Sequence, residues 1–321
     1  MDELRAAEPS SGTPAAEDQQ ALASAAPPPI AFLPAAHEPG FLNGPEGVGW
    51  GFLLYLAMAA VIGAAISFPL QSLSVPKIWG MPVSEIVALV AALVPAFILA
   101  RLEDRPFGAY GLPRHAAFGR AFWEGVVWGV AALTLLMLAL RGFGAFYFGP
   151  VVLHGVRVFK FAAFWGMVFL IVGFFEEFLV RGYTQFTLAR GLGFWPAAII
   201  LSTAFGALHL GNKGESWLGA LAAALIGLFF CLTLRRTGNL WFAVGLHASW
   251  DWSETYLYSV PNSGLKSPGH LFSSSFHGSH WLTGGSVGPE GSLLVFALIA
   301  LMWIVFDRTH RVVEWRIEPL Q

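Results

Sequence analysis

Two adjacent glutamates and an arginine interrupt an otherwise apolar stretch of the sequence. Residues 173–183 read GFFEEFLVRGY, and Glu176 and Glu177 are the only charged side chains between Phe161 and Val180. A helix needs about 20 apolar residues to cross the hydrocarbon core of a bilayer. Charged side chains at that depth are costly and usually serve a function. They are therefore the first candidates for a functional site.

Helical spacing predicts different roles for the two glutamates. Residues four apart share a helix face, whereas adjacent residues point about 100° apart. We expect Glu177 and Arg181 to form a structural ion pair, because an unpaired arginine inside a membrane is costly. Glu176 then faces another direction and is free to act on a substrate or a water molecule.

Two later segments carry histidines at the same four-residue spacing. The sequence AFGALHLGN places Phe205 and His209 on one helix face, with Phe205 as a supporting residue, and GLHASWDWSE places His247 and Asp251 on one face. A single membrane histidine is more often a hydrogen-bonded contact between helices. The combination of EExxxR, FxxxH and HxxxD on three apolar segments favours one shared catalytic site.

The depths of these residues can be compared along an antiparallel hairpin. Glu176 lies sixteen residues before Leu192 and His209 lies seventeen after it, so at about 1.5 Å per residue the two lie at similar depths and could hold one water molecule. His247 lies eight residues past Asn239, only about 12 Å from its own turn. The two histidines therefore meet only if the turns lie at different heights or a helix is broken.

A metal-dependent reaction is an alternative use of the same side chains. Glu176, His209, His247 and Asp251 offer nitrogen and oxygen atoms that could coordinate zinc. The sequence has no HExxH pair of histidines on one helical turn. The prediction is that the site needs no cofactor, with zinc as the alternative.

Composition places these residues in a membrane protein. Of 321 residues, 56% are hydrophobic and 12% are charged, and the mean hydropathy is +0.62, whereas soluble proteins have about 25% charged residues. The net charge of −2 offers no basic excess for nucleic acid, and the single Cys231 allows neither a disulfide framework nor a cysteine metal cluster. The expected partners are the lipid bilayer and a substrate associated with it.

The apolar windows predict an all-α, polytopic membrane helical bundle with about eight transmembrane helices. Strands of a membrane barrel would alternate polar and apolar residues, which these windows do not. The expected transmembrane domain covers residues 47–306, with its motifs in 161–258, between a disordered Ala/Pro-rich tail (1–46) and a short polar tail (307–321). The windows are 47–70, 83–100, 121–140, 161–190, 194–209, 217–234, 240–257 and 289–306.

Positive charges predict the orientation of the bundle. With the N-terminus in the cytoplasm, eleven lysines and arginines between or at the ends of the windows fall on the cytoplasmic side and six on the other, which favours both termini inside. The membrane would be the cell membrane of a prokaryote or the endoplasmic reticulum of a eukaryote. The Gly- and Ser-rich segment 259–288 is expected to be a solvated linker, with a lid as the alternative.

The three motifs together resemble the type II CAAX prenyl endopeptidase family, also called the CPBP or abortive-infection family of membrane proteases. The resemblance covers about residues 161–258 and includes the segment GNLWFAVGLHASWD. It implies an intramembrane glutamate-type endopeptidase acting on a membrane-associated or lipidated peptide or protein, of which a prenylated substrate is one case. By position, Glu176 would activate a water molecule that His209 holds, and His247 and Asp251 would stabilise the oxyanion.

Asp251 fits this scheme less directly than the other residues. An ionised carboxylate repels a developing oxyanion, whereas an asparagine amide would donate a hydrogen bond to it. Asp251 could act if protonated, or it could orient His247 as a hydrogen-bond acceptor.

Two functions of another class use the same features. Intramembrane Glu, Arg and His chains occur in proton-coupled transporters, and a bundle without catalysis could be a binding or immunity partner of another membrane protein. A glutamate that faces histidines from two other helices favours the protease.

Overall fold

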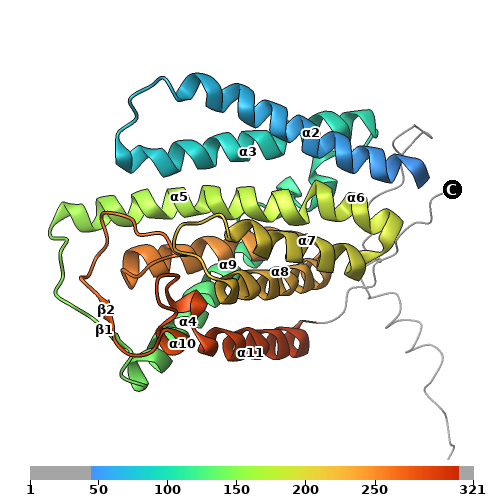
Figure 1. The fold of residues 1–321 in the computed structure, drawn as a ribbon. Helices are drawn as coiled ribbons and strands as arrows, with labels where there is room; N and C mark the ends of the chain where they lie inside the picture. Colours follow the sequence, from blue (N-terminus) through green and yellow to red (C-terminus); the bar gives the residue numbers. More distant parts are fainter. Residues whose placement is uncertain (1–44, 311–321) are drawn as a thin grey trace, which may run out of the picture.

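The computed structural model describes residues 45–310, with side chains from residue 47, and these residues form a helical bundle (Figure 1). The predicted disordered tail falls outside the described residues apart from its last two positions, and 311–321 of the predicted polar tail also lie outside them. The main helices are α2 (Pro45–Leu70), α3 (Lys77–Leu102), α4 (Arg120–Gly142), α5 (Val156–Arg181), α6 (Tyr183–Leu192), α7 (Phe194–His209), α8 (Trp217–Thr237), α9 (Trp241–Trp252) and α11 (Leu293–Thr309).

Short elements connect these helices. Two 3₁₀ turns lie between α3 and α4, a π-helical turn continues α9, and a third 3₁₀ turn precedes α11. Two two-residue strands pair antiparallel. The short elements are Phe107–Tyr110, Arg114–Ala116, Ser253–Leu257, Pro289–Gly291, β1 (Phe146–Tyr147), β2 (Ser275–Phe276) and α10 (His280–Thr283).

Every apolar window of the sequence forms a helix, which confirms the all-α membrane bundle. Within residues 45–310, five helical segments are long and apolar enough to cross a membrane, namely 47–70, 77–102, 120–142, 156–192 and 217–237. Helices α7, α9 and α11 have 16, 12 and 17 residues and are shorter. Both ends of the described chain lie at the same end of the bundle (Figure 1).

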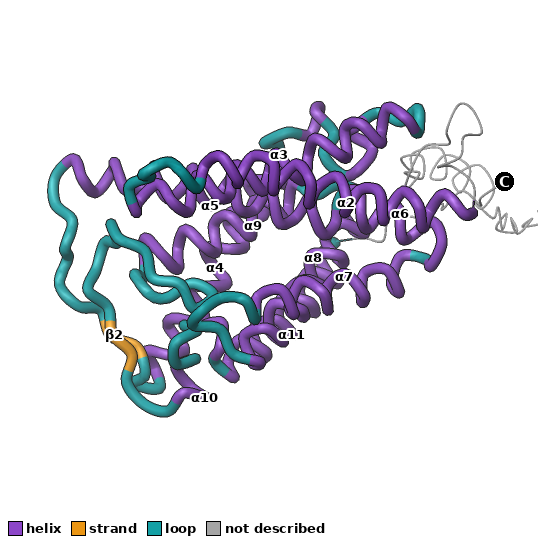
Figure 2. The backbone as a smooth tube through the Cα atoms, turned by 45° about the horizontal axis from the view of Figure 1, so that its top comes forward, coloured by secondary structure: helices purple, strands orange, loops and turns teal. Residues whose placement is uncertain are grey.

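The helices form a layered arrangement around α5 and α6. The α2–α3 hairpin packs on one side of them, and α4, α7, α8, α9 and α11 lie on the other (Figure 1). The strands lie at the end of the bundle away from the described termini, within the loops that connect α4 to α5 and α9 to α11 (Figure 2). Helices α5, α7, α8 and α9 therefore surround the interior where the motif residues converge.

The window predicted as one helix over residues 161–190 is broken at Gly182. A Cβ atom at this position would lie 2.4 Å from the Phe178 carbonyl oxygen, so only glycine fits the break. The Thr184 hydroxyl donates to the carbonyl oxygens of Leu179 and Val180 at 2.6 and 2.9 Å. These bonds satisfy backbone groups that water cannot reach inside a membrane.

Glycines bring α4 and α9 into close contact. A Cβ atom on Gly125 would lie 2.1 Å from the Phe242 carbonyl oxygen, and one on Gly245 would lie 2.2 Å from the Phe122 carbonyl oxygen. Small residues let membrane helices approach closely and gain van der Waals contact. This contact sets the position of α9, which carries His247.

We expect Gly125→Leu to destabilise the bundle by roughly 1–3 kcal/mol or more, because the side chain would force α4 and α9 apart. Gly142→Leu is the matched control on the same helix, since nothing lies within 4 Å of its Cβ position. Thermal unfolding in detergent measures both. Equal melting temperatures for the two variants would show that the close approach of α4 and α9 does not contribute to the stability of the bundle.

Candidate active site

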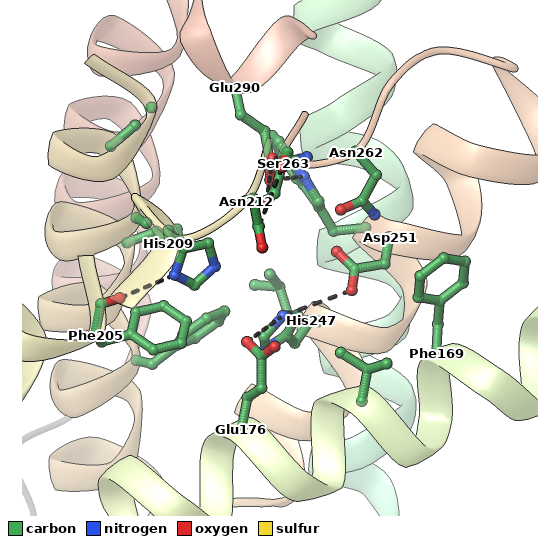
Figure 3. Close-up of a pocket in the computed structure, with 18 of the residues that line it drawn as sticks. Phe169, Glu176, Phe205, His209, Asn212, His247, Asp251, Asn262, Ser263 and Glu290 are labelled. Atoms are coloured by element: carbon green, nitrogen blue, oxygen red, sulfur yellow. Dashed lines mark hydrogen bonds and ion pairs between the residues drawn. The ribbon is translucent and has the colours of Figure 1, made fainter. Parts of the chain in front are cut away.

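Side chains from three helices meet at one cavity. Glu176 of α5, His209 of α7, and His247 and Asp251 of α9 all line it (Figure 3). Its volume is about 160 Å³, and one water molecule needs about 10–15 Å³. Much of the remaining lining is apolar and includes Met81, Phe169, Val172, Ile226, Phe230, Leu246, Ile299 and Met302. The cavity can therefore hold water beside an apolar group.

His209 and His247 reach the same cavity because the turns before their helices lie at different heights. The Leu240 amide donates to the Gly111 carbonyl oxygen at 2.8 Å. A Cβ atom on Gly111 would touch both the Leu240 side chain and Phe186, which lies within α6. Helix α9 thus begins beside the middle of α6. Helix α7 instead begins beyond the C-terminal end of α6, after Gly193. This offset compensates for the shorter distance of His247 from its own turn.

Glu176 has a carboxylate that faces the cavity. Its side chain is 23% exposed, and its Oε2 atom is buried with no partner among the described residues. The His247 Nε2 atom lies 3.6 Å from Oε2, which is too long for a hydrogen bond. A water molecule could bind to this oxygen atom.

Glu177 contacts both Arg181 and His247. Its Oε1 atom lies 3.1 Å from Arg181 Nη1 and 2.9 Å from His247 Nδ1, and the Glu177 and Arg181 side chains are fully buried. An ionised carboxylate only accepts hydrogen bonds, so Nδ1 is the donor. This bond turns the Nε2 atom of His247 toward Glu176 and Asp251. Spacing in the sequence indicated the Arg181 contact but not the one to His247.

Arg181 packs between the two aromatic rings that contact the histidines. Its guanidinium carbon lies 4.5 Å from the Phe205 ring centre and 5.4 Å from that of Phe230. Phe205 packs edge-to-face on His209 at 4.5 Å, and Phe230 stacks on His247 at 5.6 Å. The Glu177–Arg181 ion pair therefore supports the rings on both sides of the cavity.

His209 is oriented by its own helix. Its Nδ1 atom lies 2.9 Å from the Phe205 carbonyl oxygen, which can only accept a hydrogen bond, so Nδ1 carries the proton. In the neutral imidazole the Nε2 atom is then an acceptor. The His209 ring faces the interior of the cavity (Figure 3).

Asp251 lies on the other side of His247. Its Oδ2 atom is 3.6 Å from His247 Nε2, and the residue is 6% exposed. Because this distance exceeds that of a hydrogen bond, Asp251 contacts His247 electrostatically.

The cavity also contains acidic residues that lie outside the three sequence motifs. Glu85 of α3 and Glu290, just before α11, both line it. Each is the only acidic residue of its apolar window (83–100 and 289–306). The signal that singled out Glu176, a charge inside an apolar run, could have found both of them.

The loop 259–288 covers part of the cavity, which differs from the expected solvated linker. Asn262, Ser263 and Leu265 line the cavity. Glu290 Oε2 accepts hydrogen bonds from the backbone nitrogen and the hydroxyl of Ser263, at 2.8 and 2.7 Å. The pairing of β2 with β1 fixes the loop further along. These contacts join distant parts of the chain, so composition did not indicate them.

The carboxylates that lie close enough together to share a metal ion are mostly different residues from the four proposed zinc ligands. Among the described residues, Asp251, Glu254 and Glu290 have ligand atoms within 4.8 Å of one another. Of the set Glu176, His209, His247 and Asp251, only Asp251 belongs to this group.

The fold and the site define a polytopic helical membrane protein with a glutamate and histidines at a buried, largely apolar cavity. Residues 158–253 match the family described as Type II CAAX prenyl endopeptidase Rce1-like, which confirms the resemblance seen in the sequence. The matched segment runs from α5 to just beyond α9, under a third of the chain, and contains all three motifs. The match implies a membrane protease. No curated protein and no solved structure matches the chain.

We expect Arg181→Leu to destabilise the protein by about 3–5 kcal/mol, because it leaves the buried Glu177 carboxylate without its cation. Arg101→Leu is the matched control, since Arg101 is exposed near the end of α3. Thermal unfolding of the purified variants measures the difference. Similar melting temperatures would contradict a supporting role for the buried pair.

Proposed function

We propose that the protein is an endopeptidase that hydrolyses a peptide bond of a membrane-associated substrate with a water molecule activated by Glu176. The observation that carries this proposal is the Oε2 atom of Glu176, which has no hydrogen-bond partner among the described residues and faces His209 and His247 across one cavity.

The hydrogen-bonding roles suit the activation of one water molecule. Glu176 Oε2 is an acceptor, and His209 Nε2 is an acceptor because Nδ1 donates to the Phe205 carbonyl oxygen. A water molecule that donates one hydrogen to each keeps an oxygen lone pair for attack on a carbonyl carbon. Glu176 then takes a proton from the attacking water and passes it to the leaving amine nitrogen, as a general base and acid does.

His247 is positioned to stabilise the negative charge of the tetrahedral intermediate. Glu177 accepts the Nδ1 proton at 2.9 Å, so a second proton on Nε2 makes the ring an imidazolium that donates to the oxyanion. The flanking carboxylates of Glu176 and Asp251, each 3.6 Å from Nε2, favour the positive charge. Asp251 thereby acts through His247 as a positioning residue.

The apolar lining favours a lipidated peptide as substrate. Phenylalanine, valine, isoleucine, leucine and methionine side chains line the cavity beside the polar groups. Burying a prenyl chain against them contributes free energy in proportion to the apolar area removed from water. A prenylated C-terminal peptide is the substrate that this lining and the matched family suggest together.

Cleavage of a fluorogenic prenylated peptide by purified protein tests the assigned base. We expect Glu176→Gln to lower the rate by about 100-fold or more, the typical contribution of a general base, while the variant stays folded. Glu124→Gln on α4 is the control, because Glu124 contacts His310 and lies outside the cavity. A folded Glu176→Gln variant with wild-type activity would contradict the proposal.

Two rival functions give different results in the same preparation. Stoichiometric zinc that is lost in His209→Ala would indicate a metal-dependent reaction. Proton flux into liposomes that stops in Glu176→Gln, with no cleavage across a broad peptide panel, would indicate a transporter.

We expect Asp251→Asn to keep substantial activity, because Glu177 still accepts from His247 Nδ1 and Glu176 still flanks Nε2, so His247 keeps its position and its charge. Comparing its kcat with that of Glu176→Gln on the same peptide measures this. A loss as complete as that of Glu176→Gln would show that the charge of Asp251 is required.

A further inference from the structure

Three carboxylates meet where α9 ends against the segment before α11. Asp251 lies in the last turn of α9, Glu254 lies on the π-helical turn that follows, and Glu290 lies on the 3₁₀ turn Pro289–Gly291. Their ligand atoms all lie within 4.8 Å of one another. Asp251 and Glu290 also line the cavity, so water in the cavity can reach the group.

Glu254 has no partner that balances its charge. It is fully buried, and both of its carboxylate oxygens lack a hydrogen-bond partner among the described residues. The nearby Trp250 indole N–H donates to Glu290 Oε1 instead, at 3.1 Å. A buried ionised carboxylate without a partner is strongly unfavourable, so Glu254 must bind a proton or a cation.

The environment of Glu290 is that of an ionised carboxylate. Three donors point at it, namely the Trp250 indole N–H and the backbone N–H and hydroxyl of Ser263. An ionised carboxylate accepts hydrogen bonds at both oxygens, whereas a protonated one must also donate. Glu254 therefore lies beside a negative charge.

The basic groups nearby do not balance these acids. Among the described residues, one basic side chain lies within ion-pair distance of this carboxylate group. It is His247, whose Nε2 atom is 3.6 Å from Asp251. His247 also faces Glu176 and Glu177, so its single charge is shared among several carboxylates.

We propose that Asp251, Glu254 and Glu290 bind a divalent cation of the Ca²⁺ type. Hard cations prefer carboxylate oxygens, and Ca²⁺ binds them at about 2.3–2.6 Å, so ligands on opposite sides of the ion lie about 4.6–5.2 Å apart. The ligand atoms of Asp251, Glu254 and Glu290 all lie within 4.8 Å of one another, so one such ion can contact all three. Zinc usually takes histidine or cysteine ligands, which this group lacks. Water from the cavity completes the coordination.

The cation links three parts of the chain. It joins the end of α9 to the segment before α11, and through Glu290 and Ser263 it reaches the loop over the cavity. Glu254 and Glu290 both lie outside the matched segment 158–253. The site is defined by binding alone and does not depend on the proposed peptidase activity.

Terbium luminescence tests the site in the full-length protein, purified in detergent and freed of metal with a chelator. Tb³⁺ resembles Ca²⁺ in its ligands, and the Trp250 indole next to Glu290 can sensitise its emission. We expect saturable emission at about one ion per chain, displaced by Ca²⁺. Glu254→Gln and Glu290→Gln should each weaken Tb³⁺ binding at least about tenfold.

Glu85→Gln is the matched control, because it removes one acid of the same cavity outside the carboxylate group. It should leave Tb³⁺ affinity nearly unchanged. Absence of saturable emission from the wild type would overturn the proposal, as would wild-type affinity in Glu254→Gln, which would indicate that the acids share protons. If Glu254→Gln does not fold, the Tb³⁺ titrations of the wild type and of Asp251→Asn test the site instead. Unchanged Tb³⁺ affinity in Asp251→Asn would also overturn the proposal.

Discussion

The buried contact of Glu177 with Arg181 and His247 is the interaction on which the site depends. A carboxylate and a guanidinium that are both removed from solvent are stable only when paired. Arg181 lies against Phe205 and Phe230, which pack on the two histidines of the cavity. Gly227 leaves room for the guanidinium, since a Cβ atom there would lie 2.4 Å from Arg181 Nη2.

Two backbone features bring the side chains to this contact. Helix α5 ends at Arg181, and the separate helix α6 begins after the break at Gly182. The close approach of α4 and α9 at Gly125 and Gly245 holds α9 beside α5. Membrane helices gain little from a hydrophobic effect between them, so close backbone packing has to provide this stability. The cavity forms between helices that are held in this way.

The cavity combines acidic and apolar side chains. Glu85, Glu176, Asp251 and Glu290 line it together with aliphatic and aromatic side chains. In a low-dielectric setting each acid needs a proton, a cation or a hydrogen-bond donor. The proposed peptidase uses Glu176 as the acid that exchanges protons with water, and the proposed cation balances the acids at the end of α9.

The sequence by itself determined the features that depend on local spacing and composition. Apolar windows predicted the helices, a four-residue spacing predicted which residues share a face with Glu177 and His247, and charges inside apolar runs pointed to the motifs. Only the tertiary structure decided the features that join distant segments. These include the offset of α9 against α6, the bond from Glu177 to His247, and the meeting of Glu254 with Glu290. Periodicity describes one helix at a time, whereas the relative heights and rotations of helices arise from side chains packing between them.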